Sequence, residues 1–431
     1  MPNLSARSRE KRVTDCLLVM LLFALLIRLA VGIGYYNAQD TFWYRSWAFS
    51  LPDGLFDVYA RADEISLDYP PVYLFFLYIT GWMYRLIGAD CHAYVQMFLM
   101  KLWPILGDFL CGLALYAVFG RKSRKTGLLA AALWLFNPAT LFNCAFWGQT
   151  DSIMCLMLFV SFAALERDRP ILASVLFALA GMTKYQCLLF VPVFLTELFI
   201  RCRVKVFFGG IAAAAATVAA VFLPFMIGAK DPFLFFHVYL GGQDSYPYCT
   251  LNAFNLYGVL GLNWVKDTDP AIGGLTFRMI SMFVTILAVL GLIALYLFTK
   301  RRSMWVTGYL FMNTLFMLTT RMHERYQFVV LIFLLAAVLE QKDRGLFYGF
   351  AGMSAMILIN QLIPMFSWHG QESFFTLYYG ELMTAFSAVN LILYLVTGYL
   401  CIRLLCREET AAPESIRNTA GEPSLQTEDA R

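Results

Sequence analysis

The sequence CLLVMLLFALLIRLAVGIG, residues 16–34, decides the class of fold, because only one of its residues is charged. An apolar run of roughly 18 residues or more is long enough to cross a bilayer as an α-helix. The run follows the basic stretch 7–12, which has the layout of the start of a secretory signal. It extends to Gly34, however, and no small-residue cleavage site follows it. We therefore expect an uncleaved first membrane span.

Apolar runs of similar length recur along the chain as far as about residue 405. Hydrophobic residues make up 60% of the 431 residues and charged residues only 14%, which a soluble globular domain of this length does not tolerate. The sequence predicts an all-α polytopic membrane protein with a single transmembrane domain over residues 16–405. Residues 1–15 precede this domain, and the polar segment 406–431 is predicted to be a disordered tail. Basic residues are confined to short clusters between apolar runs, which argues against nucleic acid as a partner.

The basic clusters also predict the topology, because short loops rich in Lys and Arg stay on the cytoplasmic side. The clusters are 7–12, 121–125, 167–169, 201–205, 300–302, 342–344 and 403–407. If every cluster is cytoplasmic, the chain crosses the membrane an even number of times between consecutive clusters. After residue 125 this condition is met by five pairs of spans: 126–143 with 150–165, 170–182 with 186–200, 206–228 with 275–298, 303–319 with 326–340, and 345–365 with 381–405. The pair over 170–200 is short, so it is predicted to turn near residues 183–186 inside protein.

Three apolar runs precede residue 121, and an odd number of crossings would break this rule. The run 71–88 carries several Tyr and Trp residues, which favour the headgroup region, so we assign it to a helix lying in the membrane interface. The prediction is then about 12 spans with both termini cytoplasmic. Two large segments, 35–94 and 227–274, lie outside.

Polar residues at external helix ends gather at one membrane face in this topology. The first external segment contains Asp40, Asp68 and Tyr69. Asp40 is the candidate catalytic base, although it could instead cap an interfacial helix. Asp68 precedes Tyr-Pro-Pro, so it could cap the helix that starts near Pro71.

The next external turn contains Trp147, Gln149 and Asp151. Thr150 or Asp151 could cap the following helix. Capping leaves Trp147 and Gln149 unexplained, and an aromatic ring beside an amide suits sugar binding by stacking and hydrogen bonds.

Two cationic groups lie further along the chain. Lys184 and Gln186 occupy a turn within the membrane region, where a lysine is costly unless it finds an anion; snorkelling to the interface is the alternative. Arg321 and Arg325 lie four residues apart, which on one helical face makes a fork for a phosphate. His323 and Glu324 between them are taken as positioning residues, and Glu324 could instead neutralise the arginines.

Other charged residues and the cysteines are expected to be structural. Lys101 and Asp108 lie seven residues apart on one helical face and could pair with each other or with external charges. The ten cysteines show no CxxC pair and no zinc-site spacing. A disulfide between Cys91 and Cys249, both in external loops, stays open. We predict no metal site and no cofactor.

This inventory of a base, sugar-binding groups and cations suits glycosyl transfer. A sugar on a lipid phosphate has a leaving group that is stable as an anion, so one carboxylate and cationic stabilisation suffice for inverting displacement. A polar-lipid or oligosaccharide-lipid flippase is the alternative, although transporters place ionisable residues near the midplane. A non-catalytic scaffold would need none of the Asp40, Gln149 and Arg321 groups.

The motifs themselves resemble a known family. They are Asp40 with Trp47 and Gly54, Asp68–Pro71, Asn137-Pro138 leading to Trp147–Ser152, and Arg321–Tyr326. In this order they are similar to the second mannosyltransferase of GPI-anchor synthesis, in fold class C of the glycosyltransferases. The Asp-Tyr-Pro-Pro element is also similar to the dolichyl-phosphate-glucose-dependent glucosyltransferases.

The resemblance covers about residues 15–340 and implies a bacterial relative that takes a hexose, with mannose as the family-level expectation, from a polyprenyl-phosphate carrier. The acceptor would be a lipid-linked or cell-surface glycan, at the non-cytoplasmic face of the cell membrane. The resemblance also implies Asp40 as the base and interfacial helices in the first external loop. Where the family has Lys-Pro-Gln, this chain has Lys184-Tyr185-Gln186, so the turn there differs.

Overall fold

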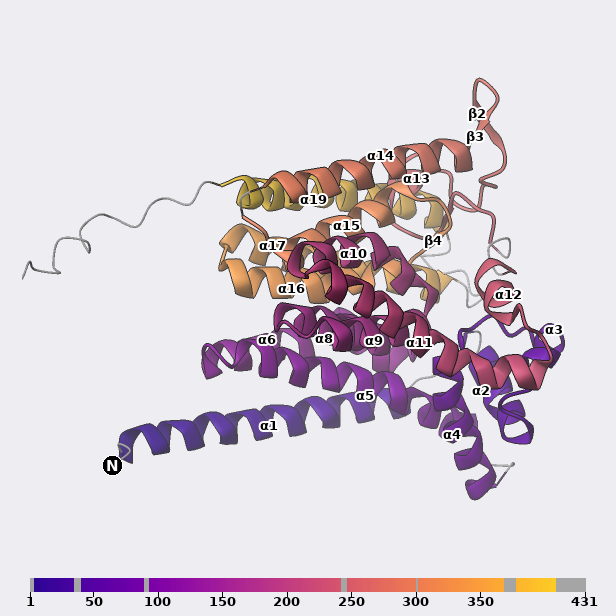
Figure 1. Ribbon diagram of the computed structural model, residues 1–431, viewed down its shortest axis with the longest axis horizontal. Helices are drawn as coiled ribbons and strands as arrows, with labels where there is room; N and C mark the ends of the chain where they lie inside the picture. Colours follow the sequence, from indigo (N-terminus) through magenta and orange to yellow (C-terminus); the bar gives the residue numbers. More distant parts are fainter. Residues whose placement is uncertain are drawn as a thin grey trace, which may run out of the picture.

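The computed structural model describes residues 4–34, 40–88, 93–241, 246–299, 301–367 and 377–407. Within them, twelve helices follow the predicted spans in order and form a bundle (Figure 1). They are α1 (Leu4–Gly34), α5 (Ala93–Phe119), α6 (Arg124–Leu135), α8 (Asp151–Glu166), α9 (Pro170–Gly181), α10 (Val191–Arg201), α11 (Val204–Ala229), α14 (Phe277–Phe298), α15 (Met304–Leu318), α16 (Val330–Gln341), α17 (Arg344–Ser367) and α19 (Tyr379–Cys406). The predicted all-α polytopic fold is confirmed.

The helices differ in whether they can cross a bilayer unaided. Six of those described are long and apolar enough, or seven if α6 and the bent segment after it form one span. Helices of 11 to 16 residues such as α10 and α8 measure only about 17–24 Å, less than the roughly 30 Å of a hydrocarbon core. The total of about 12 crossings thus depends on these shorter helices and stays a prediction.

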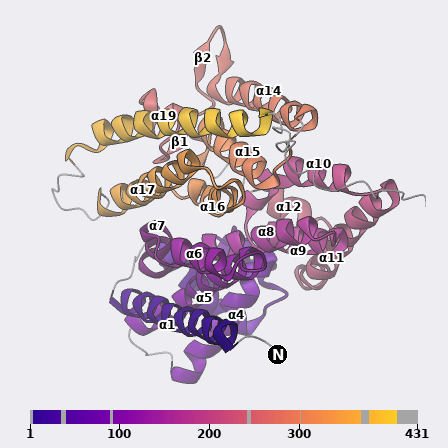
Figure 2. The same ribbon diagram turned by 90° about the vertical axis from the view of Figure 1, so that its left-hand side faces the viewer.

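The helices form two groups, seen most clearly in Figure 2, with the N-terminal helices α1, α5, α6, α8, α9 and α11 on one side and α14, α15, α16, α17 and α19 on the other. The central pair α15 and α16 is buried on nearly every side, which explains why both helices have apolar residues on every face. By contrast, α11 and α14 expose most of their apolar residues, as expected of helices that face lipid. The short helix α9 ends at Gly181, and a 3-10 turn, η4 (Tyr185–Phe190), leads into α10. The predicted break near residues 183–186 is therefore present.

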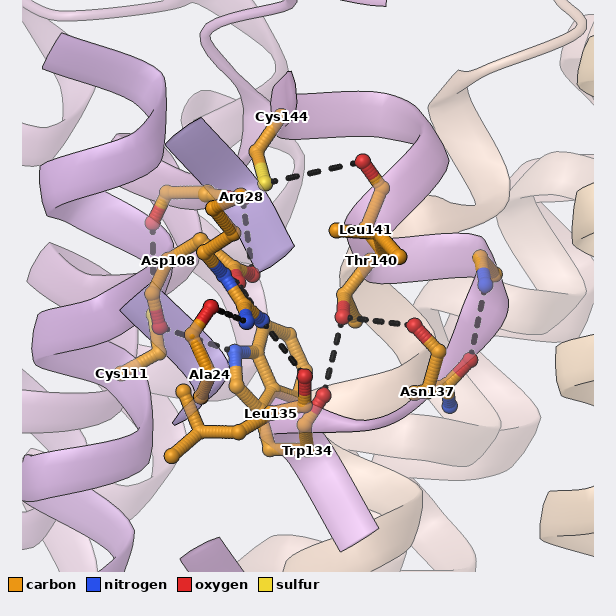
Figure 3. Close-up of polar contacts among 12 residues, drawn as sticks. Ala24, Arg28, Asp108, Cys111, Trp134, Leu135, Asn137, Thr140, Leu141 and Cys144 are labelled. Carbon is orange, nitrogen blue, oxygen red and sulfur yellow. Dashed lines mark hydrogen bonds and ion pairs between the residues drawn. The ribbon is translucent and has the colours of Figure 1, made fainter. Parts of the chain in front are cut away.

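A buried ion pair joins four helices of the first group (Figure 3). Arg28 of α1 donates from Nε to Asp108 of α5 at 2.8 Å and from Nη2 to the Leu135 carbonyl at 2.8 Å. Ser152 of α8 donates to the same carboxylate at 3.2 Å. Of the two partners left open for Lys101, Asp108 is excluded, because α1 supplies its cation; Lys101 Nζ donates to the Gly32 carbonyl at 3.4 Å.

Most of the remaining elements gather at the end of the bundle opposite the N-terminus (Figure 1). These are α2 (Asp40–Ser50), η1 (Leu51–Asp53), η2 (Val58–Arg61), α3 (Ala62–Ile65), α4 (Pro71–Ile87), α12 (Leu234–Gly241), β1 (Thr250–Leu251), α13 (Leu256–Val259), β2 (Pro270–Ile272), β3 (Leu275–Thr276), β4 (Met322–His323) and η6 (Tyr326–Val329). The two-residue strands β1 and β4 pair in parallel, and β2 pairs antiparallel with β3. We call this end of the bundle the loop end.

Helix α4 is the segment predicted to lie in the membrane interface. Figure 1 shows it inclined steeply to α1 and α5. One face of α4, with Tyr73, Leu77 and Tyr84, is buried, while Ile79 and Trp82 on the other face are exposed. An inclined helix with one apolar face left open is consistent with the predicted position in the membrane interface, which stays a prediction. Cys91 lies outside the described residues, but Cys249 is a buried free thiol, so the structure does not support the disulfide left open between them.

Candidate functional site

A cavity of about 790 Å³ opens at the loop end of the bundle. Its walls come from α2, the segment between η2 and α4, η4, α12 and the turn before η6. Seven of the side chains lining it are Trp or Tyr: Trp43, Tyr44, Trp47, Tyr59, Tyr69, Tyr185 and Tyr246. Rings with polar edges suit a ligand that has both apolar faces and hydroxyl groups.

Asp40 is the first residue of α2, and its side chain lies outside the part that the structure describes. Residues 43, 44 and 47 follow it at three, four and seven positions, a spacing that lies on one helical face. All three line the cavity. Position 40 is therefore on the face of α2 that borders the cavity, and its catalytic role stays a prediction.

Asp68 lines the cavity directly. The expected capping role is not observed, because Pro70 occupies the N-cap of α4 and provides no side-chain cap. The carboxylate is accessible from the cavity, yet protein surrounds it. This desolvation raises the pKa of Asp68 above its usual 3.8, while backbone hydrogen bonding and the charge of Arg325 oppose the shift.

Tyrosine hydroxyls connect this wall to α8. Tyr44 and Tyr69 share a hydrogen bond of 2.6 Å, and Tyr44 also donates to Gln149 Oε1 at 3.4 Å. Tyr69 contacts the Thr150 hydroxyl at 3.4 Å. Trp47 is anchored by its Nε1, which donates to the Ile65 carbonyl at 2.8 Å. The aromatic wall is thus fixed in position from behind.

Trp147 and Gln149 lie behind this wall and are buried, not exposed as a sugar-binding platform. Trp147 packs with Phe142 and Met365, and the Arg325 guanidinium lies 5.6 Å from its ring centroid. The sequence placed both residues at an external turn. It did not show that the chain around the π-helical segment η3 (Phe142–Trp147) buries both side chains inside the protein. Their contribution is to hold Tyr44 and Arg325.

Lys184 finds the anion that its position requires, and this anion is Asp151. The pair is buried, and Asn143 donates to the other Asp151 oxygen at 3.0 Å and to Gln361 Oε1 at 3.4 Å. Neither capping alternative holds, since Thr150 at the α8 N-cap makes no side-chain cap. Gln186 is also buried. The buried polar network of Lys184, Asp151, Asn143 and Gln361 therefore supports the site structurally.

The predicted phosphate fork is wrong in its geometry. Residues 321–325 form the strand β4 and a turn instead of a helix, and Arg321 has a positive φ of 66°. Arg321 donates to both oxygens of the fully buried Asp267, at 2.7 Å and 3.2 Å. Arg325 instead lines the cavity. The two guanidiniums therefore have different surroundings.

His323 and Glu324 directly precede Arg325 in the chain. Glu324 accepts a hydrogen bond of 2.7 Å from Arg325 Nη1. It therefore neutralises one of the two arginines, in part as the alternative interpretation of Glu324 expected. The His323 ring lies between Tyr246 and Tyr326, with centroid distances of 5.1 Å and 4.9 Å. Burial and the charges of Arg325 and Lys184 hold the pKa of His323 well below its usual range, which keeps the ring neutral.

Several cavity residues were not singled out from the sequence. Tyr44 could have been found from its helical spacing after Asp40. Asp231 and His237, which share a hydrogen bond of 2.6 Å at the cavity rim, come from the predicted loop 227–274 and carry no sequence signal. Among the described residues, no three His, Cys, Asp or Glu side chains are grouped to hold a metal ion.

Comparisons with known proteins agree with this architecture. A family model described as glycosyltransferase family 87 matches residues 67–320, more than half of the chain. The crystal structure of ArnT from Cupriavidus metallidurans bound to undecaprenyl phosphate is similar, with a TM-score of 0.52 and 12% identity over 90% of this chain and 77% of that one. At this identity the likeness shows a shared fold. No curated protein matches the sequence.

Proposed function

Since the chain belongs to glycosyltransferase family 87, we propose that it moves a hexose from a polyprenyl-phosphate carrier to a glycan or glycolipid acceptor. Family membership favours an enzyme over the flippase and scaffold alternatives. The fold, which matches the GT-C class through ArnT, supports a lipid-phosphate donor, because that structure contains undecaprenyl phosphate. Mannose, suggested by the motif resemblance, is the sugar we would test first.

One observation carries the proposal, namely that the 790 Å³ cavity combines aromatic walls, a carboxylate and a guanidinium. Aromatic rings and tyrosine hydroxyls suit a sugar. Asp68 is available to an acceptor hydroxyl, and Arg325 to a phosphate. The elements that line the cavity, among them α2 and α12, lie at the end of the bundle away from the N-terminus, which agrees with the proposed non-cytoplasmic site (Figure 1).

The reaction follows from these groups. The acceptor oxygen attacks the anomeric carbon, the bond from that carbon to the phosphate oxygen breaks, and the configuration inverts. Asp40 takes the hydroxyl proton, and the lipid phosphate leaves as an anion that Arg325 stabilises. Glu324 orients Arg325 through its 2.7 Å hydrogen bond, and Trp147 supports the guanidinium from behind. Asp68 binds the acceptor.

The test is a donor panel. Purified protein in detergent would be incubated with a lipid extract as acceptor and with mannose, glucose or galactose on undecaprenyl phosphate, and free lipid phosphate would be measured. We expect release that depends on both the sugar and the extract. Transfer from a nucleotide sugar without any lipid carrier would contradict the proposal.

A further inference from the structure

Asp231 and His237 form a hydrogen-bonded pair at the rim of the 790 Å³ cavity, and the reaction proposed above uses neither. Asp231 Oδ2 lies 2.6 Å from His237 Nδ1, and Asp231 Oδ1 accepts from the Phe233 amide at 2.9 Å. One carboxylate therefore both caps the start of the short helix α12 and holds the imidazole. The His237 side chain is exposed, so with Nδ1 engaged, Nε2 is the ring atom available to a ligand.

Two tyrosine hydroxyls fix α12 against the break between α9 and α10. Tyr185 donates to the Val238 carbonyl at 3.0 Å, and Tyr239 of α12 donates to the Gly181 carbonyl at 3.0 Å. The two tyrosine rings also pack edge to face, with centroids 5.4 Å apart. Because Val238 and Tyr239 directly follow His237, the backbone that carries the imidazole is held in place beside the cavity.

The outer face of α12 is apolar. Phe233, Phe236 and Leu240 follow one another at three and four residues, which places them on one helical face, and each is more than half exposed. An amphipathic helix of this kind suits the boundary between lipid and water. His237 lies four residues after Phe233, at the edge of this face, and it also lines the cavity. This is the position that the phosphate of a lipid donor reaches while its tail stays in the membrane.

The charges at the cavity are poorly matched to a phosphate unless His237 contributes. Among the described residues that line the cavity, only Arg325 and His237 can carry a positive charge, and Arg325 is already bonded to Glu324. A lipid phosphate diester brings one negative charge, and the monoester that leaves carries nearly two at pH 7. One neutralised guanidinium leaves most of this charge uncompensated. The carboxylates that share the lining are those of Asp63, Asp68 and Asp231.

We propose that His237 is a second cationic contact for the phosphate of the donor and that Asp231 is its positioning residue. This inference rests on the proposed function, since it assigns a further contact to the same lipid-phosphate donor. The imidazolium donates from Nε2 to a phosphate oxygen while the bond from the anomeric carbon to that phosphate breaks, and the Asp231 carboxylate favours the charged ring. The proton stays on His237, so the contact stabilises the leaving anion without transferring a group.

The test measures equilibrium binding of undecaprenyl phosphate in detergent, without sugar transfer. His237→Gln keeps a hydrogen-bond donor but has no charge. Lys230→Gln is the matched control, because Lys230 is an exposed cation directly before Asp231 that does not line the cavity. We expect His237→Gln to weaken binding about tenfold or more, the worth of one charged hydrogen bond, and Lys230→Gln to stay within about twofold. His237→Lys should recover part of the loss. Asp231→Asn keeps the cap of α12, so it should weaken binding at an unchanged Tm.

The pH dependence separates a charged contact from a structural one. The advantage of the parent over His237→Gln should be largest near about pH 5.5 and shrink by about pH 8, because an imidazolium loses its proton over this range. Asp231→Asn lacks the carboxylate that favours the charged ring, so its advantage should be smaller. The charged groups that line the same cavity, and the titratable groups nearest α12 on the elements packed against it, are Asp63, Asp68, Arg325, Tyr185, Tyr239 and Lys230. All six are the same in the parent and in His237→Gln, so the difference between the two profiles belongs to His237.

Equal binding by the parent and by His237→Gln at about pH 6 would overturn the proposal. So would a loss in Lys230→Gln as large as the loss in His237→Gln, or a parent that does not bind undecaprenyl phosphate. If binding depends on His237 as expected but no lipid-phosphate sugar is turned over, the proposed function fails while the phosphate contact is supported.

Discussion

Arg321 and Arg325 provide a paired test of which arginine acts on the phosphate. In the structure Arg321 binds the buried carboxylate of Asp267 through hydrogen bonds of 2.7 Å and 3.2 Å, whereas Arg325 lines the 790 Å³ cavity. Lysine keeps the charge at either position but cannot reproduce a paired fork. The same substitution therefore has opposite consequences at the two sites.

For Arg321→Lys, the fully buried Asp267 loses one of its two guanidinium hydrogen bonds and keeps the 3.2 Å bond from the Thr320 hydroxyl to Oδ2. A hydrogen bond to a charged group contributes about 1.5–3 kcal/mol, and removing the cation altogether with Arg321→Ala would cost about 3–5 kcal/mol. We expect a lower Tm in detergent and a near-parental turnover number for the folded fraction.

For Arg325→Lys, we expect an unchanged Tm and a kcat lower by roughly 10²- to 10³-fold, the usual worth of one donor to a developing anion. The assay is release of undecaprenyl phosphate, normalised to the folded fraction from thermal unfolding. If Arg325→Lys retains full turnover while Arg321→Lys loses it at parental stability, the assignment of the two arginines is reversed and the reasoning fails.

Three further predictions follow from the site and the topology. Asp40→Asn should lower turnover by roughly 10²- to 10⁴-fold with little change in stability, because asparagine still accepts a capping hydrogen bond but cannot take the proton; parental turnover in Asp40→Asn together with loss in Asp68→Asn would move the base to Asp68. The raised pKa of Asp68 predicts that activity falls as the pH is lowered, with the midpoint of this fall above pH 3.8. Arg325→Gln should move the midpoint to still higher pH, because it removes the positive charge that opposes the shift. If the same acidic fall persists in Asp68→Asn, it belongs to another group. A cysteine at position 123 in a Cys-depleted variant should react with an impermeant reagent only after permeabilisation, and labelling of intact cells would refute the cytoplasmic assignment.

The spans could be predicted from the sequence because hydropathy and the placement of basic residues act locally. The ends of α11 and α14, for instance, fall within about two residues of the expected runs 206–228 and 275–298. Helices α15 and α16 were found as apolar segments, but their burial at the centre of the bundle depends on neighbours from other parts of the chain.

The site was predicted less completely, since its side chains meet through tertiary contacts. Lys184 and Asp151 are 33 residues apart, so no local pattern shows that they neutralise each other. Arg321 pairs with a carboxylate 54 residues away, at a backbone conformation that few side chains adopt. The four-residue spacing of the arginines predicted a helix, and the strand β4 overrides it. Sequence motifs thus located the region of the site, and tertiary structure assigned the contacts within it.

The ion pair between Arg28 and Asp108 has a consequence for biogenesis. The two residues are 80 positions apart, so the first helix leaves the ribosome well before the carboxylate that neutralises it. A central arginine costs roughly 2.5–3.5 kcal/mol on insertion, which the surrounding leucines and valines must offset while the helix is alone. Insertion of α5 then removes this penalty and locks the two helices together. Assembly of the N-terminal half is therefore directional, because α1 is inserted before its counterion and a chain truncated before residue 108 would leave the Arg28 guanidinium without that carboxylate.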